Sequence, residues 1–248
     1  MHLLLFATAL AAGLVDAIAG GGGLLTVPVL LGTGLPPHLA LGTNKLQASF
    51  GSFMAARTYL RSGGVSWRQA GGGIACTLVG AVLGTRCVQQ LSPDLLRRLI
   101  PLLLLGIFLY ALFTPRLGFE DVHPRLSPAL FYPVVGVGLG FYDGFFGPGT
   151  GSFWAIAFVV LLGFNLARAT CYTKIMNFTS NVVSLAVFTA GGDVLLWTGL
   201  LMGAGQAAGA RIGAHLVLRR GPGFVRPVFL AVVFATTLKL LYDAFVNG

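Results

Sequence analysis

Long apolar stretches alternate with short polar segments along the chain, and their lengths predict membrane helices. A helix crosses a bilayer with about 20 apolar residues. Stretches of this kind cover residues 2–19, 39–60, 69–89, 95–113, 128–146, 166–190, 195–218 and 224–246. We therefore expect an all-α fold, a polytopic transmembrane helix bundle with about eight spans, within a range of about seven to ten.

Two shorter apolar pieces, 24–32 and 152–163, each follow a glycine-rich break in the sequence. Each piece is too short to cross a bilayer fully, so we interpret both as half-helices or re-entrant segments. Glycine accepts backbone conformations and close contacts that other residues resist. The breaks therefore predict two discontinuous helices, one in each half of the chain.

The two halves also resemble each other. GLVDAIAGGGG, from residue 13, aligns with GFYDGFFGPGTG, from residue 140, and three charged residues recur in the same order. The pairs are Asp16 with Asp143, Lys45 with Lys174, and Arg86 with Arg211, at offsets of 127, 129 and 125 residues. This pattern predicts two tandem repeats, residues 1–116 and 125–248, joined by an aqueous linker at 117–124.

Composition narrows the possible functions. The chain is 56% hydrophobic and only 9% charged, whereas an average soluble domain carries about a quarter charged residues. This composition excludes a disordered protein and argues against a soluble enzyme. The net charge of +9 comes mostly from residues between apolar runs, so it indicates membrane orientation and attraction of anions rather than nucleic-acid binding. No cysteine or histidine spacing indicates a metal or other cofactor, and no catalytic constellation is apparent.

Four charged residues stand inside apolar segments, where an ionisable side chain costs about 2.5–3.5 kcal/mol to insert. They are Asp16, Asp143, Lys45 and Lys174, the repeat-matched pairs. Two roles remain open at this point. The carboxylates and lysines take part in substrate binding or coupling, or they form ion pairs, Asp16 with Lys45 and Asp143 with Lys174, that only hold helices together.

The helix expected at 166–190 carries a polar stripe that must face protein or water. Its members follow helical spacing: Thr170, Lys174, Asn177, Asn181 and Ser184. If each glycine break opens a half-helix, free N–H groups and a positive dipole end point toward the membrane interior. Two such ends and two lysines predict a site for a small oxyanion near the middle of the bilayer. Gln47 and Gln206 either line a path to that site or satisfy backbone groups.

The sequence resembles the TauE/SafE-like sulfite exporter family, also called the toluene-sulfonate uptake permease family. DAIAGGGGLLTVPVLL and PPHLALGTNKLQ carry the resemblance in the first half, and GFYDGFFGPGTGSF and TKIMNFTSN carry it in the second. The resemblance implies an integral protein of the bacterial inner (plasma) membrane that moves sulfur oxyanions or organosulfonates. It places substrate-binding residues at Gly20, Gly21, Gly22, Gly23, Thr43, Asn44, Lys45, Gln47, Gly147, Gly149, Thr150, Ser152, Thr173, Lys174 and Asn177.

Together these observations predict a secondary transporter, an exporter that binds its anion between the repeats, with Asp16 and Asp143 in coupling or charge balance. The alternatives are a passive anion channel on the same scaffold and a carrier of a non-sulfur carboxylate. The expected partners are the small anion and the lipid bilayer. Proton or sodium coupling and homo-oligomerisation stay open.

Arginine positions give an expectation for orientation. With eight crossings, loops 86–98 and 211–226 lie on the same side of the membrane, which their arginines make cytoplasmic. The arginines of the 57–68 loop favour the opposite side, so the two signals conflict.

Overall fold

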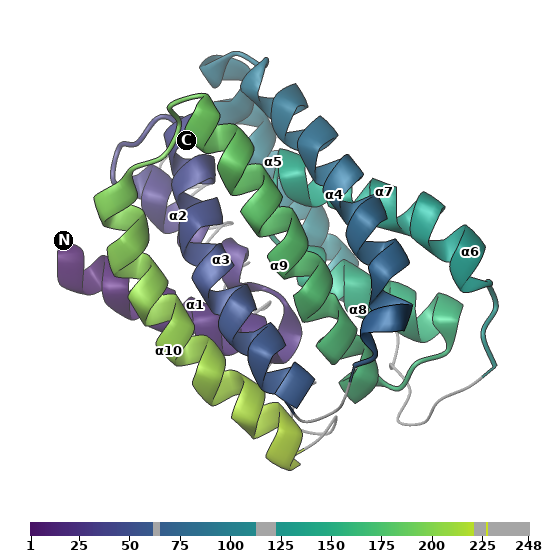
Figure 1. Cartoon of the computed structure of the whole chain (residues 1–248). Coiled ribbons are helices and arrows are strands. Elements are labelled where there is room, and N and C mark those ends of the chain that lie inside the picture. The colour runs from purple at the N-terminus through teal and green to yellow at the C-terminus, as the bar shows by residue number, and fades with distance from the viewer. Residues whose placement is uncertain (62–64, 113–122, 221–226, 228–248) are drawn as a thin grey trace.

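The computed structural model describes residues 1–61, 65–112, 123–220 and 227, and these residues form helices without any β-strand (Figure 1). The helices are α1 His2–Ala19, α2 Gly22–Gly32, α3 Pro37–Arg61, α4 Trp67–Gln89, α5 Pro93–Leu112, α6 Pro128–Phe131, a π-helical turn η1 Tyr132–Gly136, α7 Val137–Phe145, α8 Thr150–Leu162, α9 Leu166–Ala190 and α10 Leu196–Arg220. The all-α class predicted from sequence is confirmed.

The helices follow the predicted apolar stretches closely. Seven of the eight stretches coincide with helices of the described residues, and the eighth, 224–246, lies almost entirely outside them. The stretch 128–146 contains one irregularity, the π turn of η1, which includes Pro133. Proline has no N–H to donate to the helix ladder, and a local widening of the helix accommodates that loss.

Two helices are long and apolar enough to count as membrane spans by length and hydropathy, at residues 2–19 and 69–89 of the described part. The apolar helices α2 and α8 are shorter, as the sequence predicted. Large apolar side chains nevertheless remain exposed on several long helices, including Leu83 on α4, Val182 on α9 and Ile212 on α10. Exposed apolar surface of this kind suits contact with lipid. The number of membrane crossings remains a prediction.

Both glycine breaks reverse the chain inside the molecule. Gly20 ends α1 with a left-handed φ of 82°, and Gly147 and Gly149 precede α8 with φ of 97° and 81°. After the first break, α2 runs back along α1, since Leu30 packs in one cluster with Leu5. After the second, α8 returns toward α6, because Phe158 lies against Phe131. Each break therefore forms the tip of a helical hairpin.

The glycine-break helices of each half, α1 and α7, pack against long helices of the other half, α10 and α4. Gly205, Gly209 and Gly213 of α10 bring its backbone against α1. Gly140 and Gly144 of α7 approach α4 in the same manner. Small residues permit this close backbone packing where lipid provides no hydrophobic drive. The two halves are thus interlocked rather than side by side.

Helix directions correct the orientation expected from sequence. The ends of α4 and α9 meet, because the Gln89 amide donates to the Asp193 carboxylate at 2.8 Å. The ends of α3 and α10 meet at the opposite end of the molecule, where Arg57 and Arg211 line one cavity. Loop 86–98 and the described part of 211–226, up to Arg220, therefore lie at opposite ends of the molecule, and the 57–61 region lies with the end of α10. Residues 221–226 lie outside the described part. Counting the α7–α8 hairpin, which lies between these two loops in the chain, as a single crossing caused the error.

Candidate functional site

The two breaks meet at the centre of the molecule. A Cβ added to Gly20 would lie 2.5 Å from the Cα of Gly151, so the two backbones cross in direct contact. The Ser152 hydroxyl donates to the Ala19 carbonyl at 2.9 Å, which fixes this crossing. The long helices α3 and α9 pass beside it and carry the two buried lysines.

Lys45 of α3 forms an ion pair with Asp143 of α7. The Nζ–Oδ1 distance is 2.7 Å, and the side chains are 1% and 4% exposed. Lys45 also donates to the Asp143 carbonyl at 2.5 Å, and the Ser180 hydroxyl of α9 donates to the second carboxylate oxygen. A buried ion pair is stable only when such added hydrogen bonds satisfy its remaining atoms. The pair of Lys45 and Asp143 is buried and has two such added hydrogen bonds.

Lys174 of α9 forms an ion pair with Asp16 of α1. The Nζ–Oδ2 distance is 3.1 Å, and Lys174 also donates to the Asp16 carbonyl. The Asp16 side chain is 14% exposed, and its other oxygen accepts a longer bond of 3.4 Å from the Gly22 N–H. Asp16 thus lies at the edge of solvent-accessible space, while Lys174 is buried.

Both ion pairs link the two halves of the chain. The partners considered from sequence, Asp16 with Lys45 and Asp143 with Lys174, are wrong. The physical reason is the interlocked packing, because α1 and α7 each leave their own half and lie against helices of the other. Each lysine is therefore neutralised by an aspartate of the other half, and only when the two halves are packed together.

A small cavity of about 30 Å³ lies between these pairs. Its lining combines both acids, one lysine, glycines of both breaks and several amides: Asp16, Gly20, Gly23, Asn44, Lys45, Ala48, Asp143, Gly147, Thr150, Gly151, Asn177, Asn181 and Gln206. A water molecule needs a cavity of at least about 10–15 Å³ by a comparable measure. The space therefore suits a water molecule and is too small for an oxyanion with several heavy atoms.

Two amides on the cavity wall have an oxygen without a protein partner. They are Oδ1 of Asn177 and Oε1 of Gln206, both buried. Gln47 lies just outside the wall and donates to Asn44 at 2.7 Å. Buried polar atoms are normally hydrogen-bonded, so these two oxygens are available to accept from water or a bound molecule.

The N-termini of α2 and α8 lie at the same place. Gly21 and Gly149 precede these helices and neither offers a capping side chain. The first N–H groups of a helix have no partner within it, and the helix dipole makes this end positive. Helix N-termini of this kind attract anions, and here the carboxylate of Asp16 accepts from Gly22 at the start of α2.

Nine of the predicted residues line the cavity and eight do not. Gly21, Gly22 and Gly149 form the turns themselves. Thr43 accepts the Leu195 N–H at 3.0 Å, which anchors the start of α10. Ser152 holds the crossing, Gln47 supports Asn44, and the hydroxyl of Thr173 is buried without a partner. Lys174 does not line the cavity itself, but it forms an ion pair with Asp16, which does.

Four lining residues and one supporting residue were absent from the predicted site: Ala48, Gly151, Asn181, Gln206 and Ser180. Asn181 belongs to the polar stripe, so its position was available from the helical spacing. The stripe is buried throughout, as that spacing required. Ser180 stands outside the stripe, and only the approach of α7 to α9 gives it a role.

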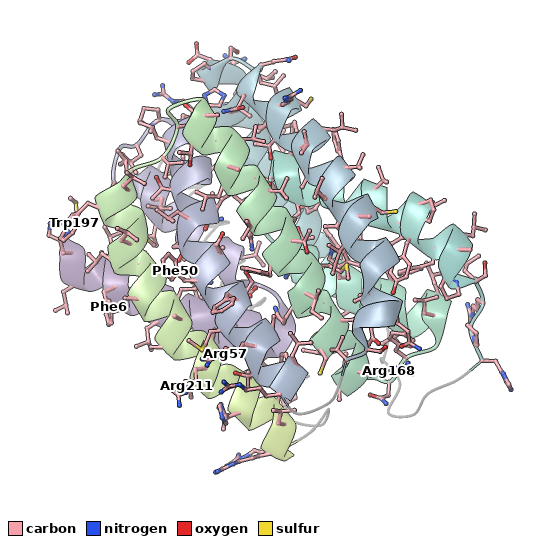
Figure 2. All side chains as sticks on the ribbon, viewed as in Figure 1. Phe6, Phe50, Arg57, Arg168, Trp197 and Arg211 are labelled. Carbon is pink, nitrogen blue, oxygen red and sulfur yellow. The ribbon has the colours of Figure 1, made fainter. Side chains whose placement is uncertain are left out.

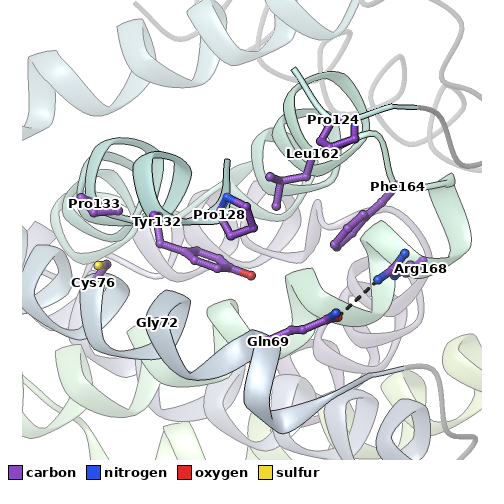
Figure 3. Close-up of a pocket in the computed structure, with 11 residues that line it drawn as sticks. Gln69, Gly72, Cys76, Pro124, Pro128, Tyr132, Pro133, Leu162, Phe164 and Arg168 are labelled. Atoms are coloured by element: carbon purple, nitrogen blue, oxygen red, sulfur yellow. Dashed lines mark hydrogen bonds between the residues drawn. The ribbon is translucent and has the colours of Figure 1, made fainter. Parts of the chain in front are cut away.

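A second, larger cavity of about 550 Å³ opens near the starts of α4 and α9 (Figure 3). Its walls are mainly apolar and aromatic, including Tyr132 and Phe164. Arg168 on its rim is already engaged, since it donates to Gln69 at 3.3 Å and its guanidinium carbon lies 4.0 Å from the Phe164 ring centre. This cavity therefore presents an arginine that its neighbours hold in place.

Comparison with known proteins gives a consistent result. The family model described as sulfite exporter TauE/SafE matches residues 5–240. The chain is 47% identical to a probable membrane transporter protein of Haemophilus influenzae, over 97% of this chain and 94% of that protein. It is also 47% identical to the probable membrane transporter protein YfcA of Escherichia coli K12, over 97% and 89%.

A Sinorhizobium protein, the probable membrane transporter protein ORF9, is 43% identical over 98% of this chain and 94% of its own length. No solved structure matches the chain significantly. The relatives are thus similar over nearly their whole length and share one description, membrane transport.

Proposed function

Because this chain belongs to the sulfite exporter TauE/SafE family and is a membrane transporter, we propose that it exports a small sulfur-containing anion, sulfite or an organosulfonate, across the bacterial inner membrane. The anion binds at the central cavity, between the two halves. The observation that carries this proposal is the pair of buried lysines, each neutralised by a carboxylate of the other half beside a broken helix.

The charge balance of the site supports an anionic substrate. Lys45 and Lys174 and the N-termini of α2 and α8 supply positive potential, and Asp16 and Asp143 cancel it while no substrate is bound. An arriving anion replaces a carboxylate as the partner of a lysine. The carboxylates therefore balance charge in the empty transporter and keep the buried lysines from standing unpaired.

The size of the cavity requires a change of shape. At about 30 Å³ it represents a closed state, so the walls must separate before an oxyanion can bind. Since both ion pairs cross between the halves, any movement that separates the halves stretches both pairs. Rocking of one half against the other is a common form of alternating access, and here it would exchange Lys–Asp contacts for Lys–anion contacts.

Membrane energetics favour export. The cytoplasm is electrically negative, and moving one charge across the membrane is worth about 2.3 kcal/mol for each 100 mV. A bound anion therefore leaves the cell downhill in potential without an added coupling ion. The same argument allows a passive channel, so the two are separated by carrier behaviour: a carrier saturates and shows counterflow, whereas a channel does neither.

The test is sulfite transport by purified protein in liposomes under an imposed potential. We expect saturable flux and counterflow, inhibition by the sulfonate isethionate, and little inhibition by acetate. Lys174→Met should lower the flux at least tenfold because the site loses a cation. Full flux in this variant, or equal competition by acetate, would contradict the proposal.

A folding control separates loss of function from loss of structure. Lys174→Met leaves Asp16 without its partner, whereas Lys174→Met combined with Asp16→Asn removes both charges of that pair. The neutral pair should recover stability, since replacing both partners is often tolerated, while flux stays low. Ser184→Ala, which removes a buried hydroxyl that has no partner, serves as the matched control with normal flux.

A further inference from the structure

A basic cavity lies where α3 and α10 end, about 480 Å³ in volume. Four of its seven lining residues are basic: Arg57 and Arg61 on α3, and Arg211 and His215 on α10. Figure 2 shows Arg57 and Arg211 close together at this end of the molecule. The remaining lining residues are Met54, Thr58 and Leu218. No acidic residue of the described chain lines the cavity.

Helical spacing explains why these side chains converge. Arg57 and Arg61 are four residues apart on one helix, and so are Arg211 and His215 on the other, so each pair projects from one helix face. The helices run in the same direction, because Gly199 contacts Leu46 and Gly203 contacts Phe50. The two basic pairs therefore face each other across the cavity.

The arginines of this cavity have no described acidic partner, unlike the two central lysines, each of which pairs with an aspartate. No described carboxylate forms an ion pair with the guanidinium groups of Arg57, Arg61 or Arg211. Arg168, at the neighbouring cavity, differs because Gln69 and Phe164 hold it. A cleft lined by charges of one sign concentrates ions of the opposite sign, and arginine binds oxyanions through paired N–H groups.

The cavity lies on the same two helices as the central site. Twelve residues separate Lys45 from Arg57 on α3, and five separate Gln206 from Arg211 on α10. At a rise of 1.5 Å per residue these spans are about 18 Å and about 8 Å along the helix axes. Ser49 and Ser52 add polar groups along α3 between the two sites, and Thr58 lines the second cavity itself.

We propose that this cavity is a second anion site, a vestibule that binds a free sulfite or organosulfonate ion before it reaches the central cavity. The identity of the anion rests on the proposed function, whereas the vestibule itself rests on Arg57, Arg61 and Arg211. A lipid phosphate has the same oxyanion chemistry, and the experiment below distinguishes it from a free ion.

The distribution of arginines places the vestibule on the cytoplasmic side. Eight described arginines gather at this end, at positions 57, 61, 68, 125, 168, 211, 219 and 220, and three lie at the other, at 86, 97 and 98. An excess of arginine and lysine marks the cytoplasmic face of a membrane protein. An exporter takes up its substrate from that face.

The first measurement probes the electrostatic potential without requiring transport. Thr58→Cys in a background with Cys76, Cys87 and Cys171 replaced by alanine offers one thiol in the vestibule. Its labelling rates with an anionic sulfonate and a cationic ammonium thiosulfonate reagent are compared. Arg57→Gln with Arg211→Gln should lower the anionic-to-cationic rate ratio at least about tenfold. Arg97→Gln with Arg98→Gln, at the other end, should leave it unchanged.

The second measurement tests binding and its source. Isethionate should slow labelling of Thr58→Cys when the two arginines are present and have no effect after their replacement. This protection should be equal in vesicles of phosphatidylcholine alone and with added phosphatidylglycerol. Protection that phosphatidylglycerol abolishes would overturn the proposal in favour of a lipid phosphate. An unchanged rate ratio in the arginine variant would overturn it outright.

Transport then separates the two proposals. If both hold, Arg57→Gln with Arg211→Gln raises the KM for sulfite presented at the basic end about five- to tenfold, while the maximal rate stays within about twofold of wild type. If isethionate protects Thr58→Cys only when the arginines are present, but the protein carries no sulfite, the proposed substrate is refuted and the vestibule stands. A protein that carries sulfite with an unchanged KM in this variant refutes the vestibule alone.

Discussion

The two lysine–aspartate pairs occupy matching positions in the two halves of the sequence, yet their surroundings differ. Lys45 and Asp143 are almost fully buried at 2.7 Å, and Ser180 adds a hydrogen bond. The pair of Lys174 and Asp16 is longer, at 3.1 Å, and Asp16 is 14% exposed. A repeated motif therefore does not produce two equivalent half-sites. The first pair is the shorter and more deeply buried one, so we expect the second to open more easily.

The difference suggests an order of events at the central cavity. An anion approaching through water meets Asp16 first, because that carboxylate is the more accessible of the two. Each aspartate takes part in three hydrogen bonds that involve a side chain, but those to the Asp16 carboxylate are longer, at 3.1 and 3.4 Å, so exchange there is the easier one. We expect the Lys174 pair to open first during transport, before the Lys45 pair between α3 and α7.

Replacement of each lysine by methionine gives the largest expected effect on stability. Lys45→Met strands a buried carboxylate and should lower the free energy of unfolding by about 3–5 kcal/mol. Lys174→Met should cost about 1–3 kcal/mol, because water reaches Asp16 in part. The measurement is unfolding of the detergent-solubilised protein followed by tryptophan fluorescence.

The matched neutral pairs complete this comparison. Lys45→Met with Asp143→Asn should recover most of the lost stability, as should Lys174→Met with Asp16→Asn. Equal losses for the two single lysine variants would show that the pairs are equivalent, and the proposed order of opening would then fail.

The glycine breaks provide a comparison of intermediate size. Gly20→Ala places a methyl group against the Gly151 backbone, 2.5 Å from its Cα, at a left-handed φ of 82°. Backbone cannot move aside easily, so we expect a loss of about 3 kcal/mol or more. Gly147→Ala meets the Lys45 ammonium at 2.8 Å, which is the mobile end of a side chain, and should cost about 1–3 kcal/mol.

Gly32→Ala is the control for both variants, because nothing lies within 4 Å of its added Cβ and its φ is not left-handed. It should leave stability unchanged or slightly raised, since alanine favours a helix over glycine. Thermal unfolding midpoints in detergent rank the three variants. A smaller loss for Gly20→Ala than for Gly147→Ala would mean that the crossing of the two breaks is looser than its geometry implies.

The sequence predicted the helices well because long apolar stretches leave the backbone few alternatives in a membrane. Their boundaries agree closely, for example 166–190 for α9. It also singled out the four buried charges from their position alone. It did not predict which charges pair, because a repeat offset relates equivalent residues and carries no information on which helices touch. That required the packing of α1 on α10 and of α7 on α4.

Other site residues were misplaced for the same reason. Thr43 neighbours Asn44 in a polar cluster, and only the fold shows that its hydroxyl accepts from Leu195 instead of facing the cavity. The orientation conflict among arginines also arose from topology. Each hairpin at a glycine break adds a reversal that hydropathy alone does not reveal. The helices between the two hairpins, α3 to α7, therefore run opposite to the prediction, and the second reversal restores the predicted direction for α9 and α10.

The last comparison tests whether Ser180 stabilises the first pair. Ser180→Ala removes the hydroxyl that donates to Asp143 and should lower the free energy of unfolding by about 1–3 kcal/mol. The α9 helix supplies a matched control four residues later, because Ser184 is equally buried and its hydroxyl has no partner.

Ser184→Ala should change stability by less than about 0.5 kcal/mol in either direction, since no hydrogen bond is lost and the hydroxyl already lacks compensation. The difference between the two variants isolates the hydrogen bond to Asp143 from the general effect of shortening a buried serine. If Ser180→Ala also lowers the coupling between Lys45 and Asp143 in a double-mutant cycle, the hydroxyl acts through the ion pair. Equal effects at the two serines would show that Asp143 gains nothing from Ser180, and the contrast between the two pairs would then rest on burial alone.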